Sequence, residues 1–237
     1  MFIGPADSAS FDIQPIRIFF NAKTRAEKLM IKNVSDDDLS LQVKAYKWSQ
    51  NSEGKDIYDE TSDIVVFPKV MKVPKGEEKI IRVGTTLHPS ALEGTYRIYV
   101  EELPVEKPQT EGVGLRIAMK VGVPVFINPL KNDGKAALDS FTVQNGKAAI
   151  KVKNDGNAHF IITSLKLTGR NEQGAEIFSR EFGGWYLLSG IARTYETDIP
   201  LQACNKIFKL SVALKTTRNS IQKDLNFSKD MCSPRGR

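Results

Sequence analysis

The sequence has few of the residue types that build metal and catalytic sites. Its 237 residues include two cysteines and two histidines, Cys204, Cys232, His88 and His159, which are not clustered in the chain. Metal sites need more such ligands at close spacing, so we expect no bound metal. Phosphate-binding loops, dinucleotide fingerprints and the Gly-X-Ser-X-Gly and HExxH patterns are also missing. With no candidate nucleophile near a histidine, the sequence predicts neither enzyme activity nor a cofactor.

Long apolar runs are missing as well. No segment approaches the ~18–20 apolar residues of a membrane span, which argues against membrane insertion. The first ten residues, MFIGPADSAS, lack the basic start and apolar stretch of a signal peptide. This pattern fits a cytosolic protein or an exported protein whose leader has been removed.

Charge of one sign is not concentrated anywhere. The net charge is +6, and no run of Lys and Arg interleaved with aromatic residues occurs. The sequence therefore predicts no nucleic-acid partner. The chain is 41% hydrophobic and 26% charged, a composition typical of a folded protein with buried cores.

Short alternating runs of apolar and polar residues recur along the chain, whereas helical periodicity is nearly missing. Turn-forming stretches such as Lys75-Gly76 and Asn145-Gly146 separate them. The expected strands are 11–20, 28–33, 40–48, 78–83, 95–103, 115–128, 147–153, 160–167, 176–182, 192–199 and 206–215. Their number and spacing predict an all-β protein built from β-sandwiches.

A short internal sequence repeat predicts two domains in tandem. The stretches Ile31-Lys-Asn33 and Val152-Lys-Asn154 each end an expected strand and precede a turn and another strand. The two asparagines lie about 120 positions apart, roughly the length of one immunoglobulin-like domain. The stretch 128–134 between them is rich in turn formers. We therefore expect domains at 1–128 and 129–237.

The expected strand 115–128 is longer than one small domain needs. Its apolar side chains share one face because they fall on alternate residues: Leu115, Ile117, Met119, Val121, Val123, Val125 and Ile127. At ~3.3 Å per residue the run spans about 45 Å, whereas an ordinary strand has ~5–6 residues. Pro124 has no backbone N–H, which confines such a strand to a sheet edge or a bulge.

This strand allows two interpretations. Either its own domain covers the apolar face, or its edge adds a strand to another protein, with alternate side chains filling pockets there. Natural edges are usually short or charged. An exposed apolar edge would also allow the free protein to associate with itself.

Several stretches of the first domain resemble the PapD-like periplasmic pilus chaperones, and within them the archaic branch. These stretches are FDIQPIRIFF, LQVKAYKWSQ, FPKVMKVPKGEEKIIRVG, TYRIYVEELP and LRIAMKVGVPVFINP, and FGGWYLLSGIARTYE gives weaker support in the second domain. The resemblance implies two immunoglobulin-like sandwiches in a boomerang arrangement and no enzyme activity. It also implies export to the periplasm, which favours a chain whose leader has been removed.

The resemblance further implies a chaperone for pilin-type subunits. Family members fill the gap in a subunit that lacks its last strand, a process called donor-strand complementation, and hand the subunit to an outer-membrane usher. The side chains expected in the subunit groove are Leu115, Ile117, Met119 and Val121. Val123 and Val125 would belong to the first domain's own core. The alternative is a structural or adhesive immunoglobulin-like surface protein, in which the strand makes permanent contacts.

Family members also hold the C-terminal carboxylate of the subunit with two basic residues between their domains. The first matches Arg17, whose guanidinium suits bidentate contact with a carboxylate. The second is a lysine in the long strand of the classical members, and Pro124 stands in its place here. Arg82 is the first expected substitute and Lys120 the second, although Arg82 fits equally well as a structural partner of Glu102.

The two cysteines leave two alternatives. A disulfide between Cys204 and Cys232 would tie the C-terminal tail to the preceding strand in an oxidising compartment. Two free thiols fit about equally well. The periplasm implied by the resemblance permits the bond without requiring it.

Overall fold

A computed structural model describes residues 11–103 and 118–232 of the chain. Nearly all the regular structure in these residues is β-strand, and their one α-helix is the short α1 (Leu201–Cys204). The expected all-β class is therefore confirmed. The chain forms two compact units, the first from 1–49, 57–90 and 94–130 and the second from 50–56, 91–93 and 131–237.

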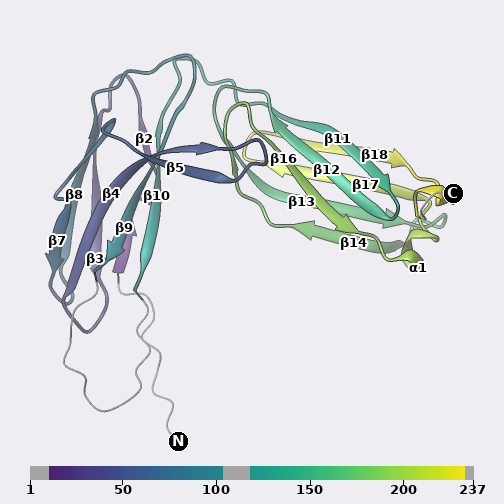
Figure 1. Ribbon diagram of the computed structural model, residues 1–237, viewed down its shortest axis with the longest axis horizontal. Coiled ribbons are helices and arrows are strands. Elements are labelled where there is room, and N and C mark those ends of the chain that lie inside the picture. Colours follow the sequence, from purple (N-terminus) through teal and green to yellow (C-terminus); the bar gives the residue numbers. More distant parts are fainter. Residues whose placement is uncertain (1–10, 104–117, 233–237) are drawn as a thin grey trace, which may run out of the picture. The chain divides into compact units, whose positions relative to one another are not determined.

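The first unit consists of two packed sheets (Figure 1, purple to teal). The four-stranded sheet has the order β1-β3-β8-β6. Its strands are β1 (Phe11–Gln14), β3 (Ala26–Asn33), β8 (Glu78–Thr85) and β6 (Ile64–Phe67). The six-stranded sheet has the order β2-β10-β9-β4-β5, with β7 on β4. Its strands are β2 (Ile18–Phe20), β10 (Lys120–Ile127), β9 (Gly94–Glu102), β4 (Leu39–Gln50), β5 (Asp56–Glu60) and β7 (Val70–Val73). Inward-facing side chains of both sheets form one core, among them Leu29, Leu41 and Ile98.

The run 11–20, expected as one strand, is two strands in different sheets. β1 ends at Gln14 and pairs with β3, while β2 begins at Ile18 and pairs with β10. Pro15 lies between them and has no N–H to donate to a ladder, so the chain can leave one sheet and enter the other here. Strands β5, β6 and β7 were not expected, because the segment 56–73 contains no long alternating run.

The second unit also consists of two sheets (Figure 1, green to yellow). The three-stranded sheet has the order β11-β12-β16, and the five-stranded sheet has the order β14-β13-β17-β18 with β15 on β13. The strands are β11 (Ala136–Gln144), β12 (Lys147–Asn154), β13 (Phe160–Arg170), β14 (Glu176–Phe182), β15 (Tyr186–Leu187), β16 (Ala192–Asp198), β17 (Lys209–Thr216) and β18 (Ser220–Asn226). Their core includes Ile150, Phe160 and Leu167.

Two short segments that adjoin strands of the first sandwich, 50–56 and 91–93, belong to the second unit, where side-chain hydrogen bonds hold them. The amide of Gln50 donates to the carbonyl of Tyr186 and accepts from the N–H of Leu188, both at 3.0 Å. The carboxylate of Glu93 lies 2.8 Å from both the backbone nitrogen and Nδ1 of His159. His159 is buried, so these bonds make it a satisfied structural histidine.

Asn33 ends β3 with its side chain fully buried. Its Nδ2 donates to the carbonyl of Asp37 at 2.8 Å and to that of Val73 at 2.9 Å. Its Oδ1 accepts a hydrogen bond from the N–H of Ser35 at 2.9 Å. One side chain therefore closes the turn after β3 and ties it to the end of β7.

Asn154 repeats this arrangement at the end of β12. It is also fully buried, its Nδ2 donates to the carbonyls of Ala158 and Leu187 at 2.9 Å, and its Oδ1 accepts from the N–H of Gly156 at 3.0 Å. The nearer partners occupy the same sequence offsets as those of Asn33. The internal repeat that contains Asn33 and Asn154 therefore corresponds to one turn structure that occurs in both sandwiches.

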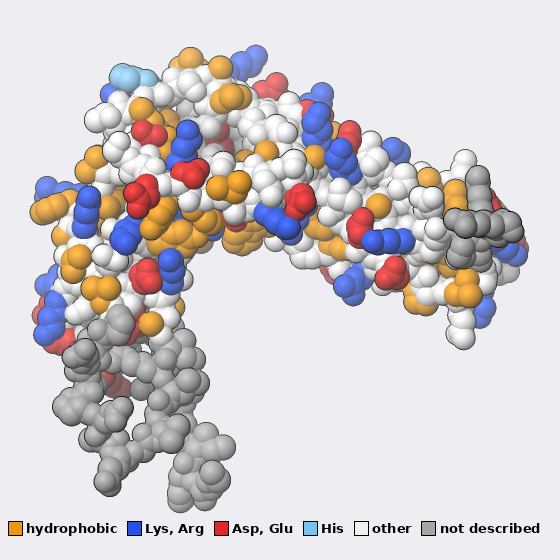
Figure 2. Space-filling model, in the orientation of Figure 1, with side chains coloured by type: hydrophobic (Ala, Val, Ile, Leu, Met, Phe, Trp, Pro, Cys, Tyr) orange, Lys and Arg blue, Asp and Glu red, His pale blue; other side chains and the backbone are white. Residues whose placement is uncertain are grey.

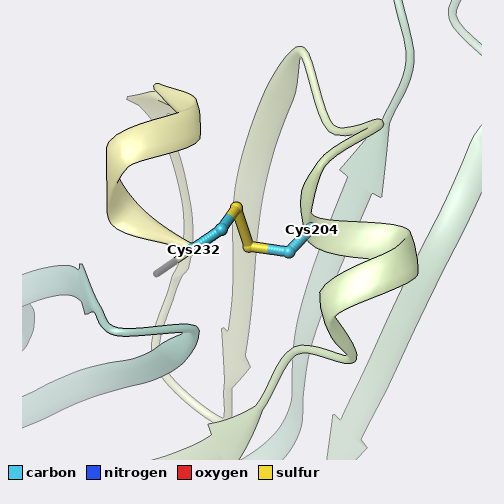
Figure 3. The surroundings of a disulfide bond; sticks show 2 residues. All are labelled: Cys204 and Cys232. Atoms are coloured by element: carbon cyan, nitrogen blue, oxygen red, sulfur yellow. A yellow bond between two sulfur atoms is a disulfide. The ribbon is translucent and has the colours of Figure 1, made fainter. Parts of the chain in front are cut away.

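Cys204 and Cys232 form a disulfide bond (Figure 3). It joins the end of α1 to the residue after the 3-10 helix η1 (Lys229–Met231). Both cysteines are buried in the core of the second unit. Of the two alternatives left by the sequence, the structure has the bonded form.

Candidate functional site

Strand β10 has one half that is paired on both sides and another half that is an edge. Residues 125–127 pair with β2 on one side and with β9 on the other. Within the described residues, 120–124 pair with β9 alone. Pro124, which has no N–H, lies where the pairing with β2 ends. The edge that this proline predicts is therefore present in the N-terminal half of the strand.

Burial of the inward-facing row of β10 matches this division. Val123, Val125 and Ile127 are at most 4% exposed and belong to the core of the first unit. The expectation that Val123 and Val125 serve their own domain is confirmed.

The other end of this row is less buried. Val121 and Met119 only pack against the core from partly exposed positions. The carbonyl of Met119 still accepts a hydrogen bond from the N–H of Glu102 at 2.9 Å, so the ladder with β9 continues to this point. Leu115 and Ile117 lie outside the described residues. The binding role of these four side chains stays a prediction.

The opposite face of the six-stranded sheet carries an aromatic cluster. Trp48 of β4 and Phe126 of β10 are both buried, with ring centroids 6.1 Å apart. Phe19 of β2 stacks on Phe126 at 5.5 Å, and Tyr58 of β5 lies 6.5 Å from Trp48. We call these four residues the aromatic face; they span the sheet from β2 to β5.

A buried arginine lies on the aromatic face. Arg97 of β9 is 6% exposed, and its guanidinium carbon lies 4.1 Å from the centre of the Trp48 ring and 5.6 Å from that of Tyr58. Stacking of this kind holds a guanidinium in one orientation. Gly122 of β10 leaves room for the stem, because a Cβ there would lie 3.0 Å from Cδ of Arg97. Sequence reasoning missed Arg97, since a single charge in an alternating strand looks like ordinary surface.

The positions expected to carry the two anchoring charges adjoin the start of the pairing between β2 and β10. The two strands are parallel and their register begins with Ile18 opposite Val125, so Arg17 and Pro124 each come directly before the first paired residue. Arg17 is exposed and makes no ion pair with any described residue. Pro124 lies opposite Arg97 in the ladder between β10 and β9. The register therefore brings Arg17, Pro124 and Arg97 to one part of the sheet.

The structure places Arg82, the first expected substitute for the missing lysine, in a different sheet from Pro124. Arg82 is exposed on β8 of the four-stranded sheet, whereas Pro124 is in the six-stranded sheet. The outer faces of two packed sheets point away from each other, so Arg82 does not lie near the anchor position. Its alternative partner, Glu102, is buried on β9 of the six-stranded sheet, so the structure does not support that pair either.

Lys120, the second expected substitute, begins β10 on the same side as Gly122 and Pro124. Its Nζ lies 3.4 Å from the carboxylate of Glu101 and 4.8 Å from the centre of the Tyr99 ring. This exposed ion pair is a weak one, which leaves the lysine able to exchange partners.

The described residues show neither a metal site nor a membrane-spanning helix. In residues 11–103 and 118–232, no group of His, Cys, Asp and Glu side chains is arranged to hold a metal ion. No helix in these ranges is long and apolar enough to span a bilayer. Figure 2 shows Lys/Arg and Asp/Glu side chains mixed over the visible face of each unit.

Among the described residues, the chain thus combines two all-β sandwiches with a strand that is paired on one side only over part of its length. Residues 10–132 match the family described as "Pili and flagellar-assembly chaperone, PapD N-terminal domain". Since the match spans more than half of the chain, the protein belongs to this family of pilus-assembly chaperones. The family acts in the periplasm and consists of assembly chaperones, not enzymes.

One curated relative is a fimbrial chaperone of Escherichia coli K12, YbgP, described as uncharacterized. It is 27% identical over 179 residues, and the match covers 68% of this chain and 67% of the relative. Family membership removes the alternative of a structural or adhesive surface protein.

Solved structures share the fold. In the CsuC–CsuE chaperone–tip adhesion subunit complex from archaic chaperone-usher Csu pili of Acinetobacter baumannii, one chain is similar with a TM-score of 0.61 and 21% identity, covering 91% of this chain and 98% of that one. In the Salmonella enterica SafA pilin–SafB chaperone complex, a chain reaches a TM-score of 0.57 at 13% identity, covering 93% and 99%. The expected immunoglobulin-like chaperone fold is thereby confirmed.

Proposed function

We propose that this chaperone folds pilin-type subunits by donating the strand 115–121 to the gap in the subunit's sandwich. The observation that carries the proposal is the division of β10: one half belongs to the core, and the other half pairs, among the described residues, with β9 alone. Main-chain hydrogen bonds of a donated edge give affinity, and alternate side chains give specificity. Burying three or four apolar side chains contributes roughly 5–10 kcal/mol before ordering and desolvation costs.

The groove-filling side chains of this proposal are Leu115, Ile117, Met119 and Val121. Met119 and Val121 already lie on the same side of the strand as the buried Val123, and strand alternation extends that row to the other two. The same row thus serves the chaperone's core at one end and the subunit at the other.

For the subunit's C-terminal carboxylate, the proposal gives Arg17 the first contact and Arg97 the second. Their support is that Arg97 lies opposite Pro124, the family's lysine position, in the ladder with β9, and that Arg17 directly precedes Ile18, which pairs with Val125 next to Pro124. Two guanidinium groups suit a carboxylate, because each offers paired N–H donors. Lys120 adds charge along the same side of β10.

The proposal also includes delivery to an outer-membrane usher and places the chain in the archaic branch. Its support is the fold shared with a chain of the Csu complex, which comes from archaic chaperone-usher pili. An incoming subunit's N-terminal extension would then replace the donated strand. This exchange needs no nucleotide or cofactor, because folding energy retained in the subunit drives it.

Arg17→Ala should weaken subunit capture by about ten- to a hundredfold, the effect of losing a charged hydrogen-bonded contact. Arg17→Lys should retain part of the binding, because it keeps the charge but loses the bidentate fork. The measurement is co-purification with the subunit encoded by a neighbouring gene. Arg82→Ala, an exposed arginine of the other sheet, is the matched control and should capture normally. Undiminished capture by Arg17→Ala would remove Arg17 from the site.

The same assay tests Arg97 through Arg97→Lys, with thermal unfolding measured alongside because the residue is buried. Reduced capture by a variant that unfolds at the parent temperature supports an anchoring role. Normal capture by such a variant would limit Arg97 to packing against Trp48 and Tyr58.

A further inference from the structure

We propose that the second unit carries a binding site of its own, for an extended peptide that presents a carboxylate close to an apolar or aromatic side chain. The site is a hollow of about 420 Å³ lined by residues 54–56, residues 183–185 and Arg193. All of these residues belong to the second unit. The site is therefore separate from the donor strand and from the anchor residues, which lie in the first.

Two basic residues line the hollow, and Lys55 is paired with the carboxylate of Glu53 at 2.7 Å, which leaves Arg193 as the cation open to a ligand. Arg193 is half-buried near the start of β16, on the same side of the strand as the buried Tyr195, and opposite the buried Val152 of β12. Its guanidinium carbon lies 5.3 Å from the centre of the Tyr195 ring. No carboxylate among the described residues pairs with it. A half-buried arginine without a counter-ion is costly, and a carboxylate from a ligand would satisfy it.

The stem of Arg193 is held in place by a close contact with Gly54. A Cβ on Gly54 would lie 3.1 Å from Cβ of Arg193 and 3.3 Å from its Cγ, and this glycine has a φ of +75°. Both the space and the backbone conformation therefore suit glycine here. This contact fixes the aliphatic part of the Arg193 side chain, from which the guanidinium extends.

Trp185 supplies an apolar surface beside this charge. Trp185 is 41% exposed, yet its Nε1–H donates to the carboxylate of Asp56 at 3.0 Å, and its ring meets that of Tyr186 edge to face with centroids 5.6 Å apart. Since the polar nitrogen already has an acceptor, the exposed part of the indole offers only its apolar ring. Such a fixed, exposed ring suits contact with an apolar or aromatic side chain.

Exposed backbone beside these two side chains favours a peptide over a small anion or a sugar. Among the described strands, β16 pairs with β12 alone, so one side of it presents free N–H and C=O groups. Gly183 and Gly184 are exposed next to Trp185, and only glycine fits at 184, because a Cβ would lie 1.7 Å from the carbonyl oxygen of Ile162. An extended peptide can pair with a strand edge while its carboxylate contacts Arg193.

Edge protection is the competing explanation for Arg193. Inward-pointing charges do keep strand edges from associating. That role accounts for neither the exposed Trp185 held by Asp56 nor the hollow next to it. The two explanations differ in what a carboxylate peptide does when it is added.

The test is an NMR titration of the full chain with three N-acetylated tetrapeptides of the sequence acetyl-Val-Tyr-Thr-X. X is glutamate with an amidated end, glutamine with a free carboxylate, or glutamine with an amidated end. We expect the two charged peptides to shift the indole N–H of Trp185 and the N–H of Gly184, and the neutral peptide to bind about tenfold more weakly or worse. Comparison of the charged pair distinguishes a side-chain carboxylate from a terminal one.

Variants with matched controls test whether Arg193 is the residue that binds the carboxylate. Arg193→Gln should weaken the charged peptides by about tenfold, while Arg180→Gln, an exposed arginine of β14, should leave them unchanged. The Ile117→Asp and Met119→Asp double variant should bind the peptides normally, since those residues belong to the first unit. Equal binding of the neutral peptide, or no effect of Arg193→Gln, would overturn the proposal in favour of edge protection. Glucuronate binding as tightly as the charged peptides would overturn the peptide as ligand.

Discussion

Asn154→Asp should destabilise the second unit by roughly 3–5 kcal/mol, a large part of the ~5–15 kcal/mol that holds an ordinary domain folded. The substitution keeps the shape of the side chain but removes its two N–H donors. The carbonyls of Ala158 and Leu187, which accept from Nδ2 at 2.9 Å, would then face a negative oxygen in a fully buried place. Urea unfolding followed by circular dichroism measures the change.

Asn33→Asp should have the same effect on the first unit, because its side chain makes the equivalent bonds to Asp37 and Val73. Asn226→Asp, at an exposed position at the end of β18, is the matched control and should change stability by less than about 0.5 kcal/mol. If Asn33→Asp and Asn154→Asp unfold at the same urea concentration as the control, the repeated asparagine is not what holds these turns.

The double variant Ile117→Asp and Met119→Asp should abolish subunit capture while the chaperone itself stays folded. Two carboxylates would have to enter an apolar groove without partners, at several kcal/mol each. The first unit should tolerate the change, because its core is built from residues such as Val123 and Val125 further along the strand. Co-purification of the subunit measures capture, and circular dichroism checks the fold.

A second double variant tests whether the loss of any exposed apolar surface would reduce subunit capture. Val65→Asp and Phe67→Asp change two apolar residues of β6 that are 56% and 70% exposed, so they remove as much apolar surface from a different edge strand. This pair should capture the subunit normally. Normal capture by the Ile117 and Met119 variant would defeat the donor-strand proposal.

Local patterns in the sequence predict those parts of the structure that depend on side-chain alternation. The division within 115–128 follows from the length of the apolar row and from Pro124, and the burial of Val123 and Val125 agrees with it. The repeated asparagine predicts the repeated sandwich, because the same turn in each sandwich needs the same buried side chain to close it. Each of these features is a local property of a strand and the turn after it.

Features that depend on contacts between distant segments could not be predicted in this way. Arg97 and Trp48 come together only because β9 and β4 are neighbours in the sheet, and each looks like an isolated residue in its own strand. The position of Arg82 in the four-stranded sheet was not predictable for the same reason, since sequence order does not say which sheet β8 joins. The segments 50–56 and 91–93 belong to the second unit, where they contact residues far away in the chain, as Glu93 does with His159.

Hydrogen exchange of the backbone amides in 115–121, compared between the free chaperone and the purified chaperone–subunit complex, tests the donated strand most directly. We expect these amides to exchange much more slowly in the complex, while those of β18 in the second unit exchange as before. Protection confined to other segments, with unchanged exchange at 115–121, would contradict the donor-strand proposal.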